Sequence, residues 1–273
     1  MDKILDLIKN KNYSYKEKHK KYYDDRNFVL EAVKINRIWL EFASYELQNN
    51  KEIVLQAIKK DGNSLYYSSE ELRKSKEFFI EALKLIGWIL KFASKELQND
   101  KEVVLEAVKK YGLSLEYASK EIQNNKEIVF EAVKNDGLSL KYASKDIQND
   151  KDVVLEAVRE NGYLLKYASK EIQNNKDIVL EAVKNEGYSL HNASQELKNN
   201  KEIVLMAIKN DGFSLVYASK ELQNNRKMIL IALKNIHFVN YSEFEYHHNK
   251  INDFIGFNGK KLKRSFCKIL KYY

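Results

Sequence analysis

The sequence predicts an all-α fold, an α-solenoid of 25-residue helix-turn-helix repeats with degenerate terminal caps. Three observations support this prediction: an invariant repeat spacing, helix-start and helix-stop residues at fixed places, and an apolar arc too wide for one unit to bury. The 273-residue chain has no proline and nine glycines, seven of which recur at one repeat position. Glycine and asparagine are therefore expected to form the turns.

One alanine marks the period of the repeat. It recurs at intervals of 25 residues, without insertion, as Ala32, Ala57, Ala82, Ala107, Ala132, Ala157, Ala182, Ala207 and Ala232. A serine ladder from Ser44 to Ser219 and a leucine ladder from Leu40 to Leu215 have the same spacing. A fixed period of this length is typical of solenoids, in which each unit packs only on its neighbours.

Each unit is expected to contain two helices of about ten residues. In the unit that begins at Gly112, Leu115, Ala118 and Ile122 lie at i, i+3 and i+7 and predict the first helix. Asn125 is expected to cap the start of the second helix, and Gly137 is expected to follow its last turn. The apolar side chains of that second helix span roughly 200°. Stacked units bury such an arc, whereas an isolated unit does not.

The repeat register divides the chain into three regions. They are an N-terminal capping repeat (1–36), eight tandem repeats (37–236) and a C-terminal cap (237–273). The first carries Lys18 and His19 where inner units have Ala and Ser, so no further unit is expected to stack there. The last has Leu262, Phe266 and Ile269 at i, i+4 and i+7 among lysines, which predicts a basic amphipathic closing helix.

The unit L-x-Y-A-S-x-E-L-Q-N-N-x-E-I-V-L-x-A-V resembles an uncharacterised repeat family, domain of unknown function 4116. The resemblance covers about residues 37–235 and is clear at residues 167–169 and 178–183. It implies tandem helical pairs and a repeat protein, and it brings no catalytic residue. Members occur in large DNA viruses, protists and bacteria, so a viral source is one of the origins that the resemblance implies.

Composition and motifs exclude several classes of protein. No run approaches the roughly 20 apolar residues that cross a bilayer, and the first residues lack a secretory cleavage pattern, so we expect a cytoplasmic protein, or one in the host cytoplasm if viral. The single cysteine, Cys267, excludes an internal disulfide framework and is expected to fill apolar space. Adjacent His247 and His248 are a poor pair of metal ligands, because successive helix residues point about 100° apart. With no phosphate loop either, we expect no catalytic residue, metal or cofactor, and no enzyme.

The first helices present aromatic and charged residues at the repeat spacing. The candidate partner-binding residues are Glu116, Tyr117, Lys120, Lys141, Tyr142, Lys145, Lys166, Tyr167, Lys170 and His191. Within the chain, the framework positions keep the same residue from repeat to repeat, whereas positions near the invariant leucine vary. Varying residues on one face of a solenoid can determine which partner it binds. The leading hypothesis is a non-catalytic scaffold that binds another protein through the first-helix face.

The alternative hypothesis is single-stranded nucleic-acid binding, in which tyrosines stack on bases and lysines pair with phosphates. A basic C-terminal patch adds Lys260, Lys261, Lys263, Arg264 and Lys268, to which nucleic acid, an anionic membrane or an acidic partner could bind. Residues 27–235, however, carry 32 basic and 31 acidic side chains, so the net charge of +8 lies mostly at the ends. A nearly neutral body is atypical of a nucleic-acid groove and favours a protein partner. The partner's identity and the oligomeric state stay open.

Overall fold

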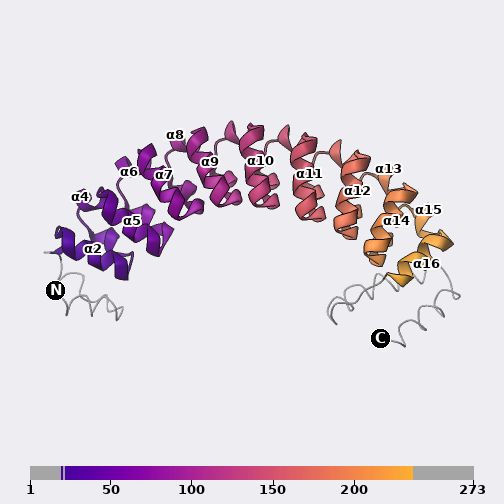
Figure 1. Ribbon diagram of the computed structural model, residues 1–273, viewed down its shortest axis with the longest axis horizontal. Helices are drawn as coiled ribbons and strands as arrows, with labels where there is room; N and C mark the ends of the chain where they lie inside the picture. The colour runs from indigo at the N-terminus through magenta and orange to yellow at the C-terminus, as the bar shows by residue number, and fades with distance from the viewer. Residues whose placement is uncertain (1–19, 21, 236–273) are drawn as a thin grey trace, which may run out of the picture. The chain divides into compact units, whose positions relative to one another are not determined.

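The protein is an all-α repeat protein. The computed structural model describes residue 20 and residues 22–235, and every regular element within them is helical. The chain divides into two compact units, residues 1–147 and 148–273, and each unit has the repeat-solenoid architecture that the sequence predicts (Figure 1). Most of the predicted N-terminal cap, the C-terminal cap and the basic C-terminal patch lie outside the described residues.

Long α-helices form one layer of each unit, and consecutive members pack side by side. In the first unit they are α2 (Arg26–Ile35), α5 (Lys51–Lys60), α7 (Lys76–Leu85), α9 (Lys101–Lys110) and α10 (Lys126–Asn135). In the second unit they are α11 (Lys151–Glu160), α12 (Lys176–Asn185), α14 (Lys201–Asn210) and α16 (Arg226–Lys234). This layer corresponds to the predicted second helices.

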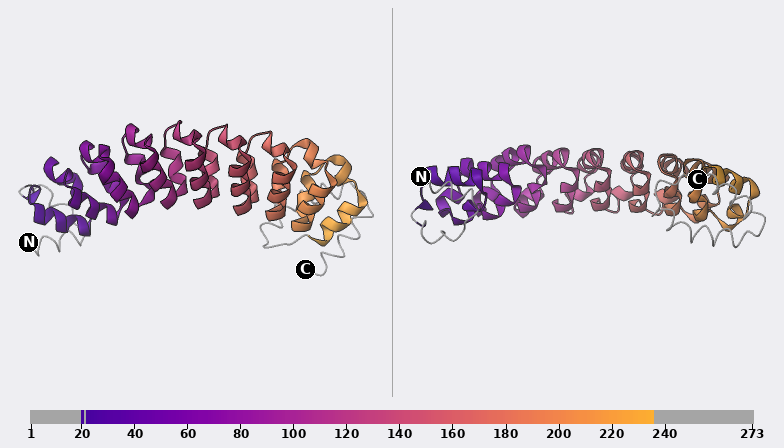
Figure 2. Two further views of the ribbon diagram at one scale, coloured as in Figure 1. Left: turned by 45° about the horizontal axis from the view of Figure 1, so that its top comes forward. Right: turned by 90° about the horizontal axis from the view of Figure 1, so that it is seen from below.

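Short helical elements form the other layer, which Figure 2 shows from two further directions. In the first unit they are α3 (Trp39–Phe42), α4 (Tyr45–Gln48), η3 (Gly62–Tyr67), α6 (Glu70–Lys74), η4 (Gly87–Phe92), α8 (Lys95–Gln98), η5 (Gly112–Tyr117), η6 (Ile122–Asn124) and η7 (Gly137–Tyr142). In the second unit they are η9 (Gly162–Tyr167), η10 (Ile172–Asn174), η11 (Gly187–Asn192), α13 (Gln195–Lys198), η12 (Gly212–Tyr217) and α15 (Lys220–Gln223). The element η8 (Ile147–Asn149) contains the boundary between the units.

The predicted first helix is two short elements instead of one continuous helix. In the repeat after α9, Ala118 is extended (φ −68°, ψ 155°) and separates the 3₁₀-helix η5 from the next turn. The backbone N–H of Ser119 donates to the carbonyl of Gln98 in the preceding repeat at 2.9 Å, so it is not available to a helix. The Ser119 hydroxyl then accepts from Ile122 N–H at 3.2 Å and so caps the turn that leads into η6. Contacts between repeats therefore override the helical pattern of the segment.

The long helices begin where the sequence predicts. Asn125 is extended, and its side-chain oxygen accepts from Ile128 N–H at 3.1 Å. Asp100 caps α9 in the same way, accepting from Glu102 N–H at 3.0 Å and Val103 N–H at 3.1 Å. Each cap satisfies amides that the first helical turn leaves without partners.

Gly137 follows the last turn of α10 in the position that the sequence predicts, one residue beyond the C-cap. The residue before it, Asp136, is an extended C-cap, and Gly137 begins the following 3₁₀-helix. What demands glycine is the close approach of the next repeat. A Cβ atom on Gly187 would lie 2.5 Å from the carbonyl oxygen of Ala207 and 2.8 Å from the Ser214 hydroxyl. Only a residue without a side chain fits this junction.

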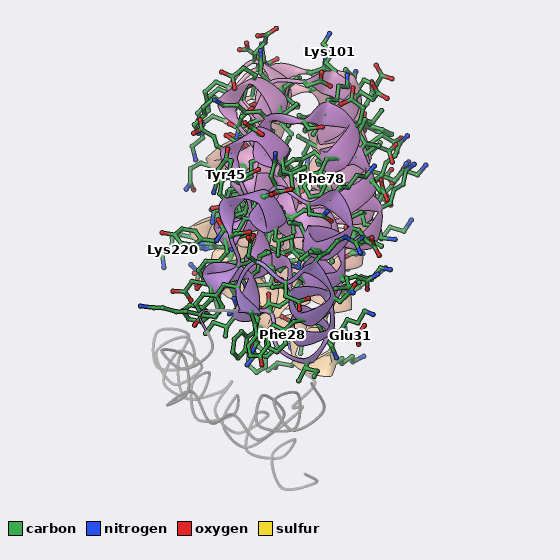
Figure 3. The ribbon with its side chains drawn as sticks, turned by 90° about the vertical axis from the view of Figure 1, so that its left-hand side faces the viewer. Phe28, Glu31, Tyr45, Phe78, Lys101 and Lys220 are labelled. Carbon is green, nitrogen blue, oxygen red and sulfur yellow. The ribbon has the colours of Figure 1, made fainter. Side chains whose placement is uncertain are left out.

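The core lies between the two layers of each unit. Leu115 and Ala132 are fully buried, and Ile122 is 1% exposed. Figure 3 labels Phe28 and Phe78 of the first unit, which are also buried, and it shows Glu31 and Tyr45 extending outward. The predicted apolar faces are therefore the stacking faces, as expected for a solenoid.

Candidate functional site

The repeated serine and glutamate form a structural network between repeats. The Ser119 hydroxyl donates to the side-chain oxygen of Asn99 in the preceding repeat, and Asn99 Nδ2 donates to Glu121 Oε2 at 3.1 Å. In the second unit the same bonds join Ser169, Asn149 and Glu171, with 3.0 Å between Asn149 Nδ2 and Glu171 Oε2. The repeated serine and glutamate side chains therefore join successive repeats in each unit.

Two of the predicted partner-binding lysines are tied to this framework. Lys120 Nζ donates to Gln123 Oε1 at 2.8 Å, and Lys170 Nζ donates to Gln173 Oε1 at 2.9 Å. Gln123 in turn donates to the buried carbonyl of Leu115 at 3.0 Å. These lysines remain at the surface, but their ammonium groups are partly satisfied within the protein.

In the first unit, the candidate residues gather where η5 packs against η7. Burial raises the pKa of the Tyr117 hydroxyl, and the nearby charge of Glu116 and the Tyr142 hydroxyl raise it further. The ammonium of Lys141 lies 5.1 Å from the centre of the Tyr142 ring. Lys145 is exposed on the turn after this pair. The packing of η5 on η7 therefore brings Glu116, Tyr117, Lys141 and Tyr142 together, with both tyrosine rings half-buried.

In the second unit, aromatic rings from η9, η11 and η12 form a connected surface. We call Tyr163, Tyr188, His191 and Tyr217 the aromatic cluster. The ring centres of Tyr188 and Tyr217 are 4.9 Å apart, as are those of His191 and Tyr217, and Tyr163 lies 5.8 Å from Tyr188. Edge and tilted contacts at these distances are favourable ring geometries.

Lysine covers part of this aromatic surface. Lys166 Nζ lies 4.0 Å from the ring centre of Tyr163 and 4.7 Å from that of Tyr167. Each exposed cation–π contact contributes about 0.5–1 kcal/mol. Lys166 and Tyr167 are predicted site residues, whereas Tyr163, Tyr188 and Tyr217 are not. The sequence signal for Tyr163 and Tyr188 is the variable position two residues before the invariant leucine.

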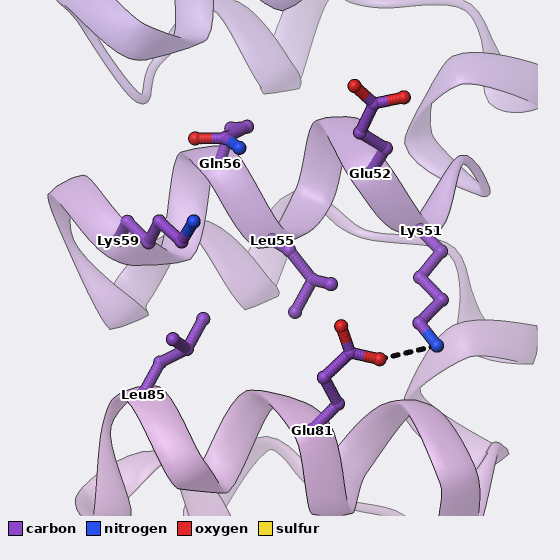
Figure 4. Close-up of a pocket in the computed structure, with 7 residues that line it drawn as sticks. All are labelled: Lys51, Glu52, Leu55, Gln56, Lys59, Glu81 and Leu85. Carbon is purple, nitrogen blue, oxygen red and sulfur yellow. Dashed lines mark ion pairs between the residues drawn. The ribbon is translucent and has the colours of Figure 1, made fainter.

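A separate groove of about 430 Å³ lies on the long-helix layer between α5 and α7 (Figure 4). Leu55 and Leu85 give it an apolar floor, and Lys51 pairs with Glu81 at 2.5 Å along one side. Leu85 occupies the repeat position at which Asn135 bonds to the preceding repeat, and leucine cannot form those bonds. The groove therefore lies at a junction that lacks the side-chain hydrogen bonds by which Asn135 joins two repeats.

The described part of the chain contains neither a cluster of three side chains able to hold a metal nor a helix with the length and apolarity to cross a bilayer. The sequence profile of the family described as Domain of unknown function (DUF4116) matches six stretches, of which the last four overlap in turn: residues 25–73, 75–123, 125–173, 150–198, 175–223 and 200–246. No curated protein and no solved structure was found to match the chain.

Proposed function

Since the chain belongs to the family Domain of unknown function (DUF4116), we propose that it is a non-catalytic repeat scaffold that binds another protein. The proposed binding surface is the short-element face, the outer side of the layer of 3₁₀-helices and short α-helices, which the sequence predicts as the first-helix face. The proposal places the scaffold in the cytoplasm, which imaging of a fluorescent fusion would test.

The aromatic cluster is the observation that supports this proposal most. Its tyrosines are half-buried, so they present rigid apolar surface together with hydroxyl groups at the rim. Tyrosine is enriched in protein interfaces because it adds large contact area at a low entropic cost. His191 and the nearby Lys166 complete a surface that is mixed in polarity, as the core and rim of a protein interface are.

The lysines favour a protein partner over nucleic acid. Lys120 and Lys170 are bonded to glutamine side chains, and Lys166 lies against two rings whose faces a stacked base would need. Acidic residues also lie beside the tyrosines, as Glu116 does beside Tyr117. A phosphate backbone approaching this face would meet few cations that are free to pair.

The full chain, used as bait for cross-linking mass spectrometry in its native cell, tests the proposal. We expect a protein cross-linked near η9, η11 and η12, and we expect its recovery to fall when Tyr188 and His191 are changed to alanine. Tyr45→Ala is the matched control, because Tyr45 is 61% exposed and lies outside the cluster. Equal loss in the control would contradict the assignment of the binding to the aromatic cluster.

Single-stranded nucleic acid is the alternative partner, since rings and lysines do recur together on this face. Measuring the affinity for a single-stranded RNA at several salt concentrations separates the nucleic-acid hypothesis from the protein-binding hypothesis. A logarithm of affinity that falls steeply with the logarithm of salt concentration, and that weakens when Lys141, Lys145, Lys166 and Lys170 are replaced, would establish the alternative.

A further inference from the structure

The outward stripe of the long helices has a regular charge pattern. From α5 onward, the first and ninth residues of every long helix are Lys or Arg. In α7, α9, α10, α11 and α12 the second and sixth residues are acidic: Glu77, Glu81, Glu102, Glu106, Glu127, Glu131, Asp152, Glu156, Asp177 and Glu181. The stripe of these helices therefore alternates in sign and carries little net charge.

The last two long helices of the second unit depart from this pattern. Met206 replaces the sixth-position acid in α14. In α16, Lys227 replaces the second-position acid and Ile231 replaces the sixth. The framework alanine of both helices is unchanged, since Ala207 and Ala232 remain buried at the same register. The departures are thus confined to outward-facing positions and are not needed for stacking.

These replacements create one cationic and apolar surface, because α14 packs against α16. We call it the α14–α16 surface; its apolar members are Leu205, Met206, Leu230 and Ile231, and its cations are Lys201, Lys209, Arg226, Lys227 and Lys234. Leu230 is 47% exposed, which is unusual for a large aliphatic residue in this protein. The apolar residues occupy the middle of each helix, with cations at both helix ends.

The cations of the α14–α16 surface are not neutralised within the described chain. None of the five has an ion pair or a side-chain hydrogen bond among residues 22–235, and all five are exposed. The surface has one acid, Glu202, which pairs with Lys176 of the neighbouring helix α12 at 2.6 Å. An apolar strip between two rims of uncompensated positive charge remains.

We propose that the α14–α16 surface docks an acidic amphipathic helix of a partner protein. Apolar side chains on one face of that helix would cover Leu230 and Ile231, and carboxylates beside them would pair with Lys209, Lys234 and Arg226. The apolar strip favours a helix over a lipid surface, because Leu205, Met206 and Ile231 are half-buried and do not protrude as residues that insert into a bilayer must. This surface belongs to the long-helix layer, so the inference does not depend on the proposed short-element face.

The probe is a fluorescein-labelled synthetic peptide of about 16 residues, with leucines at i, i+3, i+4 and i+7 and glutamates elsewhere. Fluorescence anisotropy with the full chain should show saturable binding that weakens with salt. A scrambled peptide of the same composition should bind at least about tenfold more weakly. Equal binding of the two peptides would overturn the proposal, since charge alone would then explain the association.

Charge reversal locates the binding. Lys209→Glu with Lys234→Glu should weaken peptide binding at least about tenfold. The matched control is Lys84→Glu with Lys109→Glu, which makes the same change of net charge at the ninth positions of α7 and α9, where Glu81 and Glu106 are retained. Similar losses in the two variants would refute the α14–α16 surface. Unchanged thermal melting shows that each variant is folded.

Two further measurements complete the test. A benzophenone on the apolar face of the peptide should cross-link to residues 201–210 or 226–234, and cross-links confined to other elements would exclude the site. Co-sedimentation with phosphatidylcholine vesicles containing about 30% phosphatidylserine tests the lipid alternative. Vesicle binding that Leu230→Ser abolishes, in the absence of peptide binding, would replace the partner helix by a membrane surface.

Discussion

The side-chain oxygen of Asn135 accepts a hydrogen bond of 2.7 Å from the backbone N–H of Gly112, which belongs to the preceding repeat. The same carboxamide donates through Nδ2 to the carbonyl of Lys109 at 2.9 Å. One side chain thus satisfies both a donor and an acceptor at the point where the preceding helix ends. Asn185 and Asn210 form the same pair of bonds in the second unit, to Gly162 and Gly187.

Asn135→Ala should therefore destabilise the protein by about 1–3 kcal/mol, because the amide of Gly112 and the carbonyl of Lys109 lose their partner at a part-buried junction. Urea denaturation followed by circular dichroism measures the change. Lys110→Ala is the matched control at the same repeat position, where the side chain forms no such bond, and it should change stability by less than about 0.5 kcal/mol. Equal changes in the free energy of unfolding for the two variants would mean that the hydrogen bonds of Asn135 contribute nothing to stability.

Gly112→Ala should cost about 1–3 kcal/mol or more by overpacking. The new methyl group would overlap the backbone carbonyl of Ala132 and lie 2.8 Å from the Ser139 hydroxyl, and neither the backbone nor its repeat can move easily. Gly62→Ala is the comparison, because its methyl group would meet side-chain atoms of Ile89 at 2.7 Å and Trp88 at 2.9 Å, which can shift. Thermal melts should rank the Gly112 variant below the Gly62 variant, and the reverse order would contradict the geometry.

Ser119→Ala should destabilise the protein by about 1 kcal/mol, since it removes the cap of the following turn and the bond to Asn99 of the preceding repeat. A double-mutant cycle with Asn99→Ala measures how much of this loss of stability comes from the hydrogen bond between Ser119 and Asn99. We expect a coupling energy of about 0.5–1.5 kcal/mol. Strictly additive effects would show that the bond between the two side chains does not contribute to stability.

Lys198→Gln should stabilise the protein by about 1 kcal/mol. Lys198 stands where most repeats have a glutamine like Gln173, whose Nε2 donates to the carbonyls of Leu165 and Ala168 at 3.2 Å. Burial lowers the pKa of Lys198 below its ordinary value of 10.5, and the charge of Lys170 lowers it further. The protonated lysine is therefore disfavoured in the folded state.

The pH dependence of the stability gained by Lys198→Gln follows from the direction in which the pKa of Lys198 is shifted. Because the folded protein binds this proton less readily than the unfolded chain, the penalty is complete at neutral pH and declines as pH rises toward 10.5. Urea denaturation at pH 7 and at about pH 10 should show a smaller advantage of the glutamine variant at the higher pH. A variant less stable than the parent at pH 7 would show that packing of the lysine stem outweighs its charge.

The sequence is sufficient for the architecture and for the long-helix layer. The spacing of Ala107 and Ala132 gives the period, and caps such as Asn125 give the helix starts, because capping and amphipathic periodicity are local properties of the chain. The buried faces also follow from the sequence, since only stacking can cover an apolar arc as wide as that of α10. Part of the candidate surface follows as well, since the regular spacing of Tyr117 and Tyr142 places both on one face.

The tertiary structure decides what depends on atoms a whole repeat away. The helical pattern around Ala118 gives two short elements because Ser119 N–H bonds to Gln98, and Gly187 is required by the carbonyl of Ala207 and not by its own backbone angles. The meeting of Tyr188 with Tyr217 likewise arises only when η11 packs on η12. Local sequence specifies each unit, whereas the distances between side chains of successive units are set by how the units stack.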